Sequence, residues 1–360
     1  MRGRGLTILS VVGARPNFMK LAPLARQLAR RQGVRHVIVH TGQHYDEGMS
    51  ESFLRTLRIP TPDFNLAAGS GSHAQQTATI MQRFEPVCQE IRPDIVLVYG
   101  DVNSTLAAAL VAAKLGIKVG HVEAGLRSRD WSMPEEINRV VTDRLSDLLF
   151  TPSRDADENL RLEGVAAERV HFVGNIMIDS LVELLPEARR RQSNGGRQPG
   201  PYAVVTLHRP ANVDDPATLV AVMDGLVELA AERRILFPVH PRTRARLNDI
   251  GWRAGTDRLE LREPVSYVEM LSLVLGSDLV ITDSGGLQEE TSFLGVPCVT
   301  VRPNTERPIT CVAGTNRLVA ARRDAICEGA HAAMAARRPK PAALERWDGQ
   351  TAQRIAAILL

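Results

Sequence analysis

The feature of this sequence that most constrains its fold is a repeated alternation of two kinds of segment. Short apolar runs rich in β-branched residues alternate with longer Ala-, Leu- and Arg-rich segments of helical periodicity. The runs are almost continuously apolar, which is typical of parallel strands covered by helices on both faces. We therefore predict a doubly wound α/β protein. The expected strands are Leu6–Val12, His36–Thr41, Asp94–Tyr99, Ile117–Val122, Leu148–Phe150, Val170–Val173, Tyr202–Leu207, Ile235–Val239, Leu259–Leu261, Leu279–Thr282 and Pro297–Val301.

The alternation is interrupted once, between Glu187 and Pro201. There the chain becomes cationic and then rich in Gly and Pro, and apolar periodicity is lost, which indicates a linker. We predict a first Rossmann-like domain over 1–187, a linker over 188–201, a second Rossmann-like domain over 202–340 and a closing helix in 341–360. A length of 360 residues suits two such domains. Open α/β sheets bind ligands at their strand ends, so we expect the two domains to face a cleft.

Charge and hydropathy exclude several classes of partner. The 44 basic and 41 acidic residues nearly cancel, so the net charge of +3 provides no field that would favour nucleic acid or an anionic membrane surface. No apolar stretch approaches the roughly 20 residues that a membrane-spanning helix needs. The apolar run near the N-terminus is short, is soon followed by Arg15 and lacks a small-residue cleavage site. We therefore interpret it as a buried strand rather than a signal peptide.

Cysteine and histidine spacing gives no indication of a metal site. The cysteines, Cys88, Cys298, Cys311 and Cys327, form no CxxC pair and too few pairs for a disulfide framework. This usage favours a reducing compartment, and we expect a cytoplasmic protein. His36, His40 and His44 recur every four residues, but on an expected strand and turn that spacing does not converge on one metal.

The first expected strand runs directly into a turn that opens a helix. Gly13 follows the strand and Pro16 stands in the first helical turn, so an anion could bind the helix N-terminus with Arg15 and Lys20 beside it. A simpler interpretation of Arg15 is an ordinary solvated side chain. Neither half of the chain has a GxGxxG fingerprint or a Walker loop, so we expect no NAD or ATP and no other cofactor.

Carboxylates follow several first-half strands. Asp101 lies just past the third expected strand, Glu123 lies at the end of the fourth, and Glu135 and Glu136 open a helix. Each could simply cap a helix or complement its dipole, an effect worth roughly 0.3–1 kcal/mol. If they converge on one rim, their mutual repulsion raises at least one pKa, as acid/base catalysis requires.

In the second half, His208 and His240 follow two neighbouring strands at equivalent positions. A lone histidine is more often structural than catalytic, but two at the same sheet edge favour a functional role.

The segment after the expected strand Leu279–Thr282 resembles a phosphate cradle. Ser284, Gly285 and Gly286 offer a hydroxyl and unshielded backbone N–H groups at a helix N-terminus. Glu290, further along that helix, could bind a ribose diol, and Arg302 follows the next strand. Together these groups predict a nucleoside diphosphate bound by the second domain.

The whole chain resembles the non-hydrolysing UDP-N-acetylglucosamine 2-epimerases. The motifs that carry the resemblance occur in the family order: VVGARPNFMK, TGQHYD, GDVNST, HVEAGLRS, MPEEINR, GNIMID, TLHRP, VHPRTR, TDSGGLQEE and NTERP. The resemblance implies a glycosyltransferase-B type fold whose C-terminal helix packs back on the first domain, and a homodimer. It also implies reversible conversion of UDP-GlcNAc to UDP-ManNAc through 2-acetamidoglucal, without metal or NAD. In the family this reaction supplies a sugar nucleotide for surface polysaccharide synthesis.

The resemblance also implies roles for individual residues. Asp101, Glu123 and Glu135 match the family's catalytic acids, and His208 matches its essential histidine. The positions that match substrate-binding residues are Arg15, Lys20, Gln43, Arg209, His240, Ser284, Gly285, Gly286, Glu290 and Arg302. Which carboxylate acts as the base stays open, because coupled groups titrate as a set.

Three departures from the common bacterial pattern concern the substrate. The segment between Glu123 and Glu135 is shorter, Arg-Pro-Ala-Asn follows His208 without the usual Glu, and Ile309 follows TERP. These features resemble a branch that includes relatives acting on UDP-2,3-diacetamido-glucuronic acid. The sequence also leaves open a hydrolysing epimerase, a retaining glycosyltransferase and a non-catalytic UDP-sugar sensor.

Many bacterial members of the family need UDP-GlcNAc as an activator at a second site. Gln43, Glu136, Arg209 and His240 match that site, but Asp46 stands where a second Gln is expected. The stretch GSGSHAQQ, residues 69–76, lacks the expected Arg. Both changes disfavour a second diphosphate, so we predict turnover without an activator.

Overall fold

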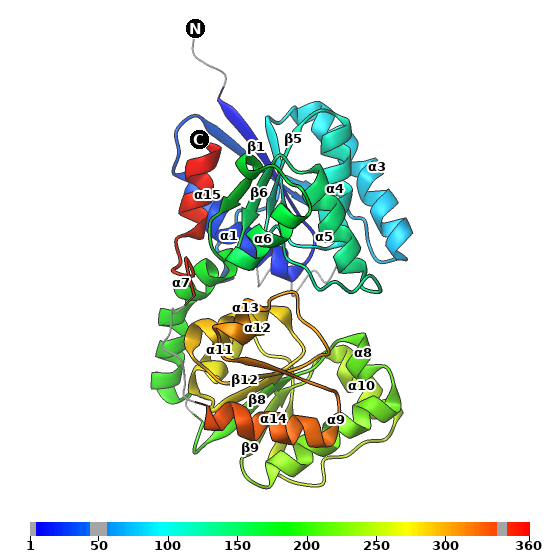
Figure 1. Ribbon diagram of the computed structural model, residues 1–360, viewed down its shortest axis with the longest axis vertical. Helices are drawn as coiled ribbons and strands as arrows, with labels where there is room; N and C mark the ends of the chain where they lie inside the picture. Colours follow the sequence, from blue (N-terminus) through cyan, green and yellow to red (C-terminus); the bar gives the residue numbers. More distant parts are fainter. Residues whose placement is uncertain (1–4, 44–55, 197, 337–343) are drawn as a thin grey trace. The chain divides into compact units, whose positions relative to one another are not determined.

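The computed structural model describes residues 5–43, 56–196, 198–336 and 344–360 (Figure 1). The chain forms two compact units. The first comprises Met1–Ser180 together with Glu345–Leu360, and the second comprises Leu181–Leu344.

Within the described residues, the first unit contains a seven-stranded sheet of order β3-β2-β1-β4-β5-β6-β7, in which every pairing is parallel. Its strands are β1 (Leu6–Val12), β2 (Val34–His40), β3 (Phe64–Asn65), β4 (Ile95–Tyr99), β5 (Lys118–Val122), β6 (Leu148–Thr151) and β7 (Val170–Phe172). Its helices are α1 (Arg15–Ala29), α3 (His73–Ile91), α4 (Asn103–Lys114), α5 (Pro134–Leu145), α6 (Arg154–Leu162) and α15 (Thr351–Leu359), with a short 3-10 turn at Ala167–Arg169.

The second unit, over the residues described, contains a six-stranded parallel sheet of order β10-β9-β8-β11-β12-β13. Its strands are β8 (Tyr202–Thr206), β9 (Arg234–Pro238), β10 (Leu259–Arg262), β11 (Leu279–Thr282), β12 (Cys298–Val301) and β13 (Asn316–Val319). Its helices are α8 (Pro210–Val213), α9 (Pro216–Ala230), α10 (Pro241–Asp249), α11 (Tyr267–Gly276), α12 (Gly285–Leu294), α13 (Ile309–Val312) and α14 (Arg323–Ala335).

The strand order of each sheet reverses once, between β1 and β4 and between β8 and β11. This is the strand order of a Rossmann-like fold, which binds ligands outside the carboxyl ends of the strands at the point of reversal. The two parallel sheets with helices between their strands confirm the predicted fold class, two Rossmann-like domains of the glycosyltransferase-B type.

Helices cover both faces of each sheet (Figure 1). In the first unit, alternate strand residues such as Leu9 and Val11 pack with Ile80 and Phe84 of α3 in one core, while α1 and α15 pack together elsewhere on that unit. In the second unit, α9 and α14 pack on one face and α11 and α12 contribute to a second core. Burial on both faces is why the strands are continuously apolar.

Most expected strands are present within one or two residues of their predicted bounds. Two edge strands, β3 and β13, were not predicted. The first has two residues and the second reads Asn-Arg-Leu-Val, so neither carries an apolar run. Edge strands are covered less completely than central ones and tolerate polar residues.

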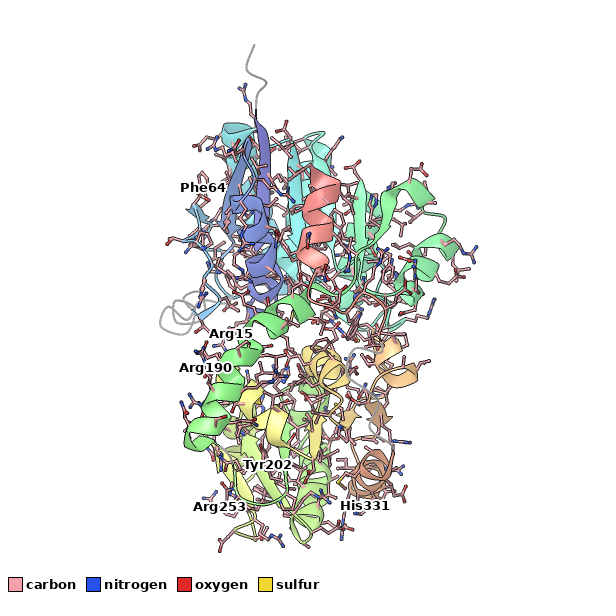
Figure 2. The ribbon with its side chains drawn as sticks, turned by 90° about the vertical axis from the view of Figure 1, so that its left-hand side faces the viewer. Arg15, Phe64, Arg190, Tyr202, Arg253 and His331 are labelled. Carbon is pink, nitrogen blue, oxygen red and sulfur yellow. The ribbon has the colours of Figure 1, made fainter. Side chains whose placement is uncertain are left out.

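The predicted linker over 188–201 is wrong in its first part. Helix α7 (Ile176–Arg191) continues through the cationic run, and a π-helical turn, Gln192–Gly196, extends it (Figure 2 labels Arg190 on this helix). The chain passes from one unit to the other inside α7, between Ser180 and Leu181. The physical reason is that Arg favours helix and that the buried stripe of Leu181, Leu184, Leu185 and Ala188 continues the helical spacing.

The C-terminal segment belongs to the first unit from Glu345 onward. Its helix α15 packs against α1, and the buried Asp179 carboxylate accepts hydrogen bonds from the backbone N–H groups of Thr351 (3.1 Å) and Ala352 (2.7 Å). Among the described residues, no helix combines the length and the apolar character needed to cross a bilayer.

Candidate active site

The turn between β1 and α1 is built around Asn17. Its buried Oδ1 accepts hydrogen bonds from the backbone N–H groups of Gly13 (3.2 Å) and Ala14 (3.1 Å), and its Nδ2 donates to the carbonyl of Tyr99 (2.8 Å). A Cβ at Gly13 would lie 2.1 Å from Ser104 Oγ, so only glycine fits. The turn therefore ties the end of β1 to the end of β4.

The helix that follows carries the two predicted cations. Arg15 is its first residue and is exposed (Figure 2), whereas Lys20 is buried. Lys20 Nζ forms an ion pair with Glu123, and a Cβ at Gly100 would come within 2.7 Å of the same nitrogen. The structure thus brings together Lys20 and Glu123, which are distant in sequence.

Glu123 directly follows β5 and adopts a left-handed backbone conformation with φ of 77°. Its N–H and that of Ala124 both donate to the carbonyl of Phe150 at the end of β6. A non-glycine residue held at positive φ stores strain of order 1–3 kcal/mol, a feature that clusters at functional sites.

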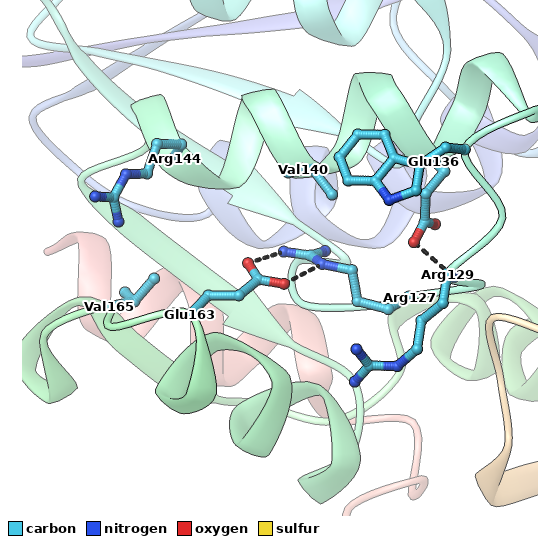
Figure 3. A pocket seen from close by; sticks show the side chains of 8 residues that line it. Arg127, Arg129, Glu136, Val140, Arg144, Glu163 and Val165 are labelled. Carbon is cyan, nitrogen blue, oxygen red and sulfur yellow. Dashed lines mark hydrogen bonds and ion pairs between the residues drawn. The ribbon is translucent and has the colours of Figure 1, made fainter.

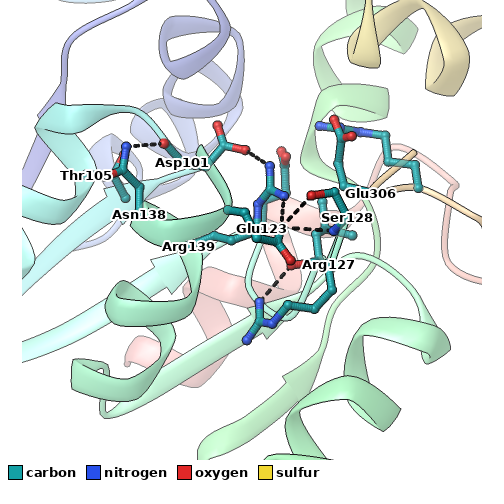
Figure 4. A network of polar contacts seen from close by, with 12 residues as sticks. Asp101, Thr105, Glu123, Arg127, Ser128, Asn138, Arg139 and Glu306 are labelled. Atoms are coloured by element: carbon teal, nitrogen blue, oxygen red, sulfur yellow. Dashed lines mark hydrogen bonds and ion pairs between the residues drawn. The ribbon is translucent and has the colours of Figure 1, made fainter. Parts of the chain in front are cut away.

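Asp101 follows β4 and is only partly buried. Its carboxylate pairs with Arg139 of α5, and its backbone carbonyl accepts a hydrogen bond from Asn138 Nδ2 at 2.9 Å (Figure 4). Arg139 also pairs with Glu136. Arg139 was not predicted, and its only sequence signal is its place in the motif MPEEINR.

The two glutamates in the first turn of α5 differ. Glu135 is exposed. Glu136 is buried and accepts hydrogen bonds from the N–H and hydroxyl of Ser128 (both 2.9 Å) and from the N–H of Arg129 (2.8 Å). Burial alone would raise the pKa of Glu136, but these hydrogen bonds and the charge of Arg139 outweigh it, and the net effect lowers this pKa.

Gln43 is buried beside the β1–α1 turn. Its Oε1 accepts hydrogen bonds from the N–H (3.2 Å) and the hydroxyl (2.6 Å) of Ser104. Its backbone carbonyl accepts from Gln76 Nε2 at 3.3 Å. His44 and Asp46, which follow it in the sequence, lie outside the described residues.

A cavity of about 360 Å³ opens next to Glu136 in the first unit (Figure 3). Its lining comprises Arg127, Arg129, Trp131, Glu136, Val140, Arg144, Glu163 and Val165. Of the predicted site residues only Glu136 reaches it, so this cavity does not coincide with the set formed by Lys20, Glu123 and Asp101.

In the second unit, His208 is oriented by Asp283. His208 Nδ1 lies 3.0 Å from Asp283 Oδ1, and the fully buried carboxylate also accepts the backbone N–H groups of His208 and Arg209. Burial would raise the pKa of Asp283, but the hydrogen bond and charge of His208 and those N–H groups outweigh it and lower the pKa. Because a carboxylate accepts the Nδ1 proton, Nε2 of His208 is the nitrogen left to act on a ligand.

The structure brings the two predicted histidines together. The rings of His208 and His240 lie 5.5 Å apart at a tilt of 39°. His240 is exposed and caps α10 by accepting the N–H of Arg242 on Nδ1 (3.2 Å). Arg209 points toward Glu306, with 4.0 Å between Nη2 and Oε1.

The predicted cradle lies at the start of α12. Ser284 is its N-cap residue, and Gly285 and Gly286 form its first turn, all three partly exposed. A Cβ at Gly285 would lie 2.7 Å from Arg307 Nη1, so a side chain there would displace this arginine. The first N–H groups of the helix have no intrahelical acceptor and favour an anion.

Four buried charges alternate beside the cradle. Arg302 donates to Glu306 (2.8 Å), Glu306 pairs with Arg307, and Arg307 pairs with Glu289 (2.7 Å). Within the part of the chain that the structure describes, the buried Nη1 of Arg302 donates no hydrogen bond. A buried guanidinium N–H without an acceptor is costly and suits an anionic ligand.

Glu290 lies one turn beyond the cradle on α12 and is buried against α11. Tyr267 donates a hydrogen bond to Glu290 Oε1 at 2.9 Å. Burial raises the pKa of Glu290 to about 7, with a further increase from the charge of neighbouring Glu289. Tyr267 and Asp283 are site residues that were not predicted, because their partners lie far away in sequence.

No group of three His, Cys, Asp or Glu side chains in the described residues has the arrangement needed to hold a metal ion. The first unit offers carboxylates paired with cations, an arrangement suited to proton transfer. The second offers a helix N-terminus, buried arginines and an oriented histidine, suited to binding an anionic leaving group.

Comparison with known proteins gives the family that the chain resembles. A family model described as UDP-N-acetylglucosamine 2-epimerase matches residues 26–360. The chain is 42% identical over 318 residues to the UDP-N-acetylglucosamine 2-epimerase of Methanococcus maripaludis, a match that covers 86% of each chain. It is also 42% identical over 334 residues to the UDP-2,3-diacetamido-2,3-dideoxy-D-glucuronate 2-epimerase of Pseudomonas aeruginosa, covering 91% of this chain and 92% of the relative.

Among solved structures, the chain is similar to the UDP-GlcNAc 2-epimerase of Methanocaldococcus jannaschii in complex with UDP-GlcNAc and UDP. The TM-score is 0.90 and the identity 38%, over 98% of this chain and 99% of that one.

Proposed function

Because the chain belongs to the UDP-N-acetylglucosamine 2-epimerase family, we propose that it interconverts UDP-GlcNAc and UDP-ManNAc without net hydrolysis. The observation that carries this proposal is the pairing of two carboxylates with two cations after β4 and β5, Asp101 with Arg139 and Glu123 with Lys20. Positioned carboxylates of this kind can accept and donate protons as general bases and acids.

The proposed reaction avoids direct removal of the C2 proton, which is not acidic. The C1–oxygen bond to UDP breaks as the C2 proton is lost to a carboxylate, giving 2-acetamidoglucal and UDP. UDP then adds back to C1 while a proton is delivered to the opposite face of C2. The transition state has oxocarbenium character, which nearby carboxylates stabilise, as in glycoside hydrolysis.

We assign the proton-transfer roles to Asp101, Glu123 and Glu135. Lys20 and Arg139 contact two of these carboxylates directly, which supports a site where negative charge is balanced rather than dispersed by water. Exposed Glu135 has the freedom to approach a ligand. Arg15 at the start of α1 and Gln43 beside it complete the proposed contacts of the first unit.

We assign UDP binding to the second unit. The N–H groups of the Ser284–Gly286 turn and the Nη1 of Arg302 are the proposed donors to the diphosphate, and Glu290 is the proposed acceptor for the ribose hydroxyls. His208, oriented by Asp283, is the proposed partner of the departing phosphate oxygen, with Arg209 and His240 beside it.

The reaction in heavy water tests the proposal. Incubation with UDP-GlcNAc should yield UDP-ManNAc that carries one solvent deuteron at C2, detected by NMR and mass spectrometry. Epimer without deuterium at C2 would exclude elimination and re-addition. Accumulation of free ManNAc and UDP would instead identify a hydrolysing epimerase.

The similarity to the Pseudomonas aeruginosa relative favours one second candidate, the 2-epimerisation of UDP-2,3-diacetamido-2,3-dideoxy-D-glucuronate. The chemistry at C1 and C2 is the same, so only the sugar contacts differ. Comparing kcat/KM for the two sugar nucleotides on the same preparation decides between them. We further propose that the protein is a cytoplasmic homodimer that serves surface polysaccharide synthesis. Measuring the molecular mass in solution tests whether it is a dimer.

A further inference from the structure

His121, on β5, is fully buried and lies between two hydrogen-bond acceptors. Its Nδ1 is 2.6 Å from Asp143 Oδ1, and its Nε2 is 2.7 Å from the carbonyl oxygen of Gly100. A carbonyl oxygen only accepts, and so does an ionised carboxylate. Both ring nitrogens must therefore carry a proton to satisfy these contacts, which makes the ring an imidazolium.

The surrounding charges support an ionised Asp143. Its second oxygen accepts from Arg127 Nη1 (2.7 Å) and from the N–H of Gly125 (3.0 Å), and both donors are buried. Arg127 also binds Glu163 through two hydrogen bonds of 2.7 Å (Figure 3). With His121 protonated, two positive and two negative groups cancel, whereas a neutral ring would leave one negative charge in excess.

This buried network reaches both turns that carry proposed proton-transfer groups. His121 binds the carbonyl of Gly100, the residue directly before Asp101. Asp143 binds the N–H of Gly125, two residues after Glu123. Asp143 itself lies on α5, the helix that carries Glu135 in its first turn. One pair of side chains thus connects three elements of the proposed site.

The geometry points to His121 as a positioning residue, a buried imidazolium that, held by Asp143, fixes the turn of Asp101 relative to the turn of Glu123. This inference rests on the proposed epimerisation. Within the described part of the chain, both ring nitrogens are engaged in the protein core and leave no position open to a ligand. The effect of His121 on catalysis is therefore through the placement of Asp101.

The protonation state is tested on the wild-type protein without any assay of activity. With nitrogen-15 histidine labelling, NMR should show a histidine whose two ring nitrogens both carry a proton and donate hydrogen bonds, and this signal should be missing from His121→Gln. A wild-type spectrum without a doubly protonated ring would overturn the inference, even if the enzyme epimerises as proposed.

The positioning role is tested by kinetics. His121→Gln removes the charge and leaves one amide donor, so kcat should fall about 100-fold, the scale of a misplaced catalytic group, while KM and UDP affinity stay nearly unchanged. Asp143→Asn should likewise lower kcat and leave KM and UDP affinity nearly unchanged. This variant replaces His121→Gln in the test if His121→Gln does not fold. The double variant should lose little more than either single one, because the two act as a unit.

His36→Gln is the matched control. His36 also lies on a strand of the same sheet, β2, and its Nε2 is 2.9 Å from the hydroxyl oxygen of Ser10 on β1. The substitution therefore perturbs a histidine contact inside the sheet, and this ring contacts β1 rather than binding the turn of Asp101 directly. This variant should keep wild-type kcat.

Two kinetic outcomes would show that the network is structural only: normal turnover in folded His121→Gln, or an equal loss in His36→Gln at equal stability. A wild-type enzyme that epimerises no UDP-sugar would refute the proposed function instead.

Discussion

At the scale of single residues, the proposed proton carriers differ from the buried carboxylates around them. Burial alone would raise the pKa values of Glu136 and Asp143, but the backbone and side-chain donors and the positive charges around their oxygens outweigh it and lower both values. Asp101 is partly exposed, Glu135 is exposed, and buried Glu123 faces the lysine Lys20. A carboxylate that a ligand can reach, or one that faces another group able to carry a proton, is the better candidate for proton transfer.

We predict that Asp101→Asn, Glu123→Gln and Glu135→Gln each lower turnover by about 100-fold or more, the usual scale for loss of a general acid or base. UDP affinity, measured by calorimetry, should change little because the proposed UDP contacts lie in the second unit. Glu168→Gln, an exposed glutamate in the 3-10 turn, is the control. Near-normal turnover in all three variants would remove these carboxylates from the mechanism.

The raised pKa of Glu290 predicts a pH-dependent affinity. Below its pKa of about 7 the carboxyl group is protonated and loses the charge with which, in our proposal, it accepts hydrogen bonds from the ribose hydroxyls. If only the ionised form binds well, the dissociation constant of UDP-GlcNAc should rise roughly tenfold from pH 8 to pH 6. Glu290→Gln should bind weakly at both pH values. An equally steep pH profile in that variant would place the titrating group elsewhere.

At the scale of elements, the attachment of α15 depends on Asp179. Burial raises the pKa of this carboxyl group to about 6, although it accepts two backbone N–H groups of the helix. The folded state therefore holds the proton more tightly than the unfolded chain. The stabilisation that results is complete below the ordinary pKa near 3.8 and is lost as the pH rises through 6.

We therefore predict that the unfolding free energy of the wild type, relative to that of Asp179→Asn, falls as the pH rises from 4 to 6, as measured by urea denaturation. Asp215, which caps α9 at the surface, is the matched control. Hydrogen bonds from Thr218 lower its pKa, so the corresponding difference for Asp215→Asn should not fall over the same interval. Parallel curves for the two variants would contradict the assignment to Asp179.

Elements with a local sequence signal could be predicted, and those that depend on distant contacts could not. The strand Leu279–Thr282 is found with its predicted bounds because an apolar run ends at a polar turn. The helical continuation through Arg190 was missed because Arg-rich segments are compatible with both helix and linker, and burial of Leu184 decides between them. Local propensity is outweighed by such packing.

The same distinction applies to the site. Residues that follow a strand, such as Asp101 and His208, could be proposed because the strand itself was recognisable. Their partners could not, since Arg139 and Asp283 meet them only in the folded chain. His121 could not be identified as a site residue for a further reason. It stands inside an apolar strand, where a histidine is usually interpreted as part of the core.

At the scale of the whole molecule, the two units have the same kind of strand order but different polar groups at their strand ends. The first has paired carboxylates and cations after β4 and β5, and the second has a helix N-terminus with buried arginines after β11 and β12. Rossmann-like sheets place functional groups at equivalent strand ends, so side chains rather than topology decide each role. Under the proposed assignment of roles, UDP binding and proton transfer can be altered separately by substitutions in different units.

Regulation gives the last prediction, because it concerns residues of both units. Of the positions that resemble an activator site, Gln43 accepts hydrogen bonds from Ser104, and Glu136 has its oxygens occupied by backbone and side-chain donors. Asp46, outside the described residues, adds a negative charge where the family has an amide, and no arginine occurs in 69–76. Both differences disfavour a second diphosphate.

We predict that UDP-ManNAc alone is epimerised at once and that initial rates follow a hyperbola in substrate concentration. Allosteric coupling is typically about 1–3 kcal/mol, or roughly 5- to 150-fold in affinity, so its presence would be plain in initial rates. Replacing Asp46 by Gln restores the family's amide, and any activation that appears only in this variant would trace the loss to that charge. A reverse reaction that stays silent until a trace of UDP-GlcNAc is added would show instead that the wild-type chain retains the activator site, and that hydrogen bonds from the remaining residues compensate for the missing cation.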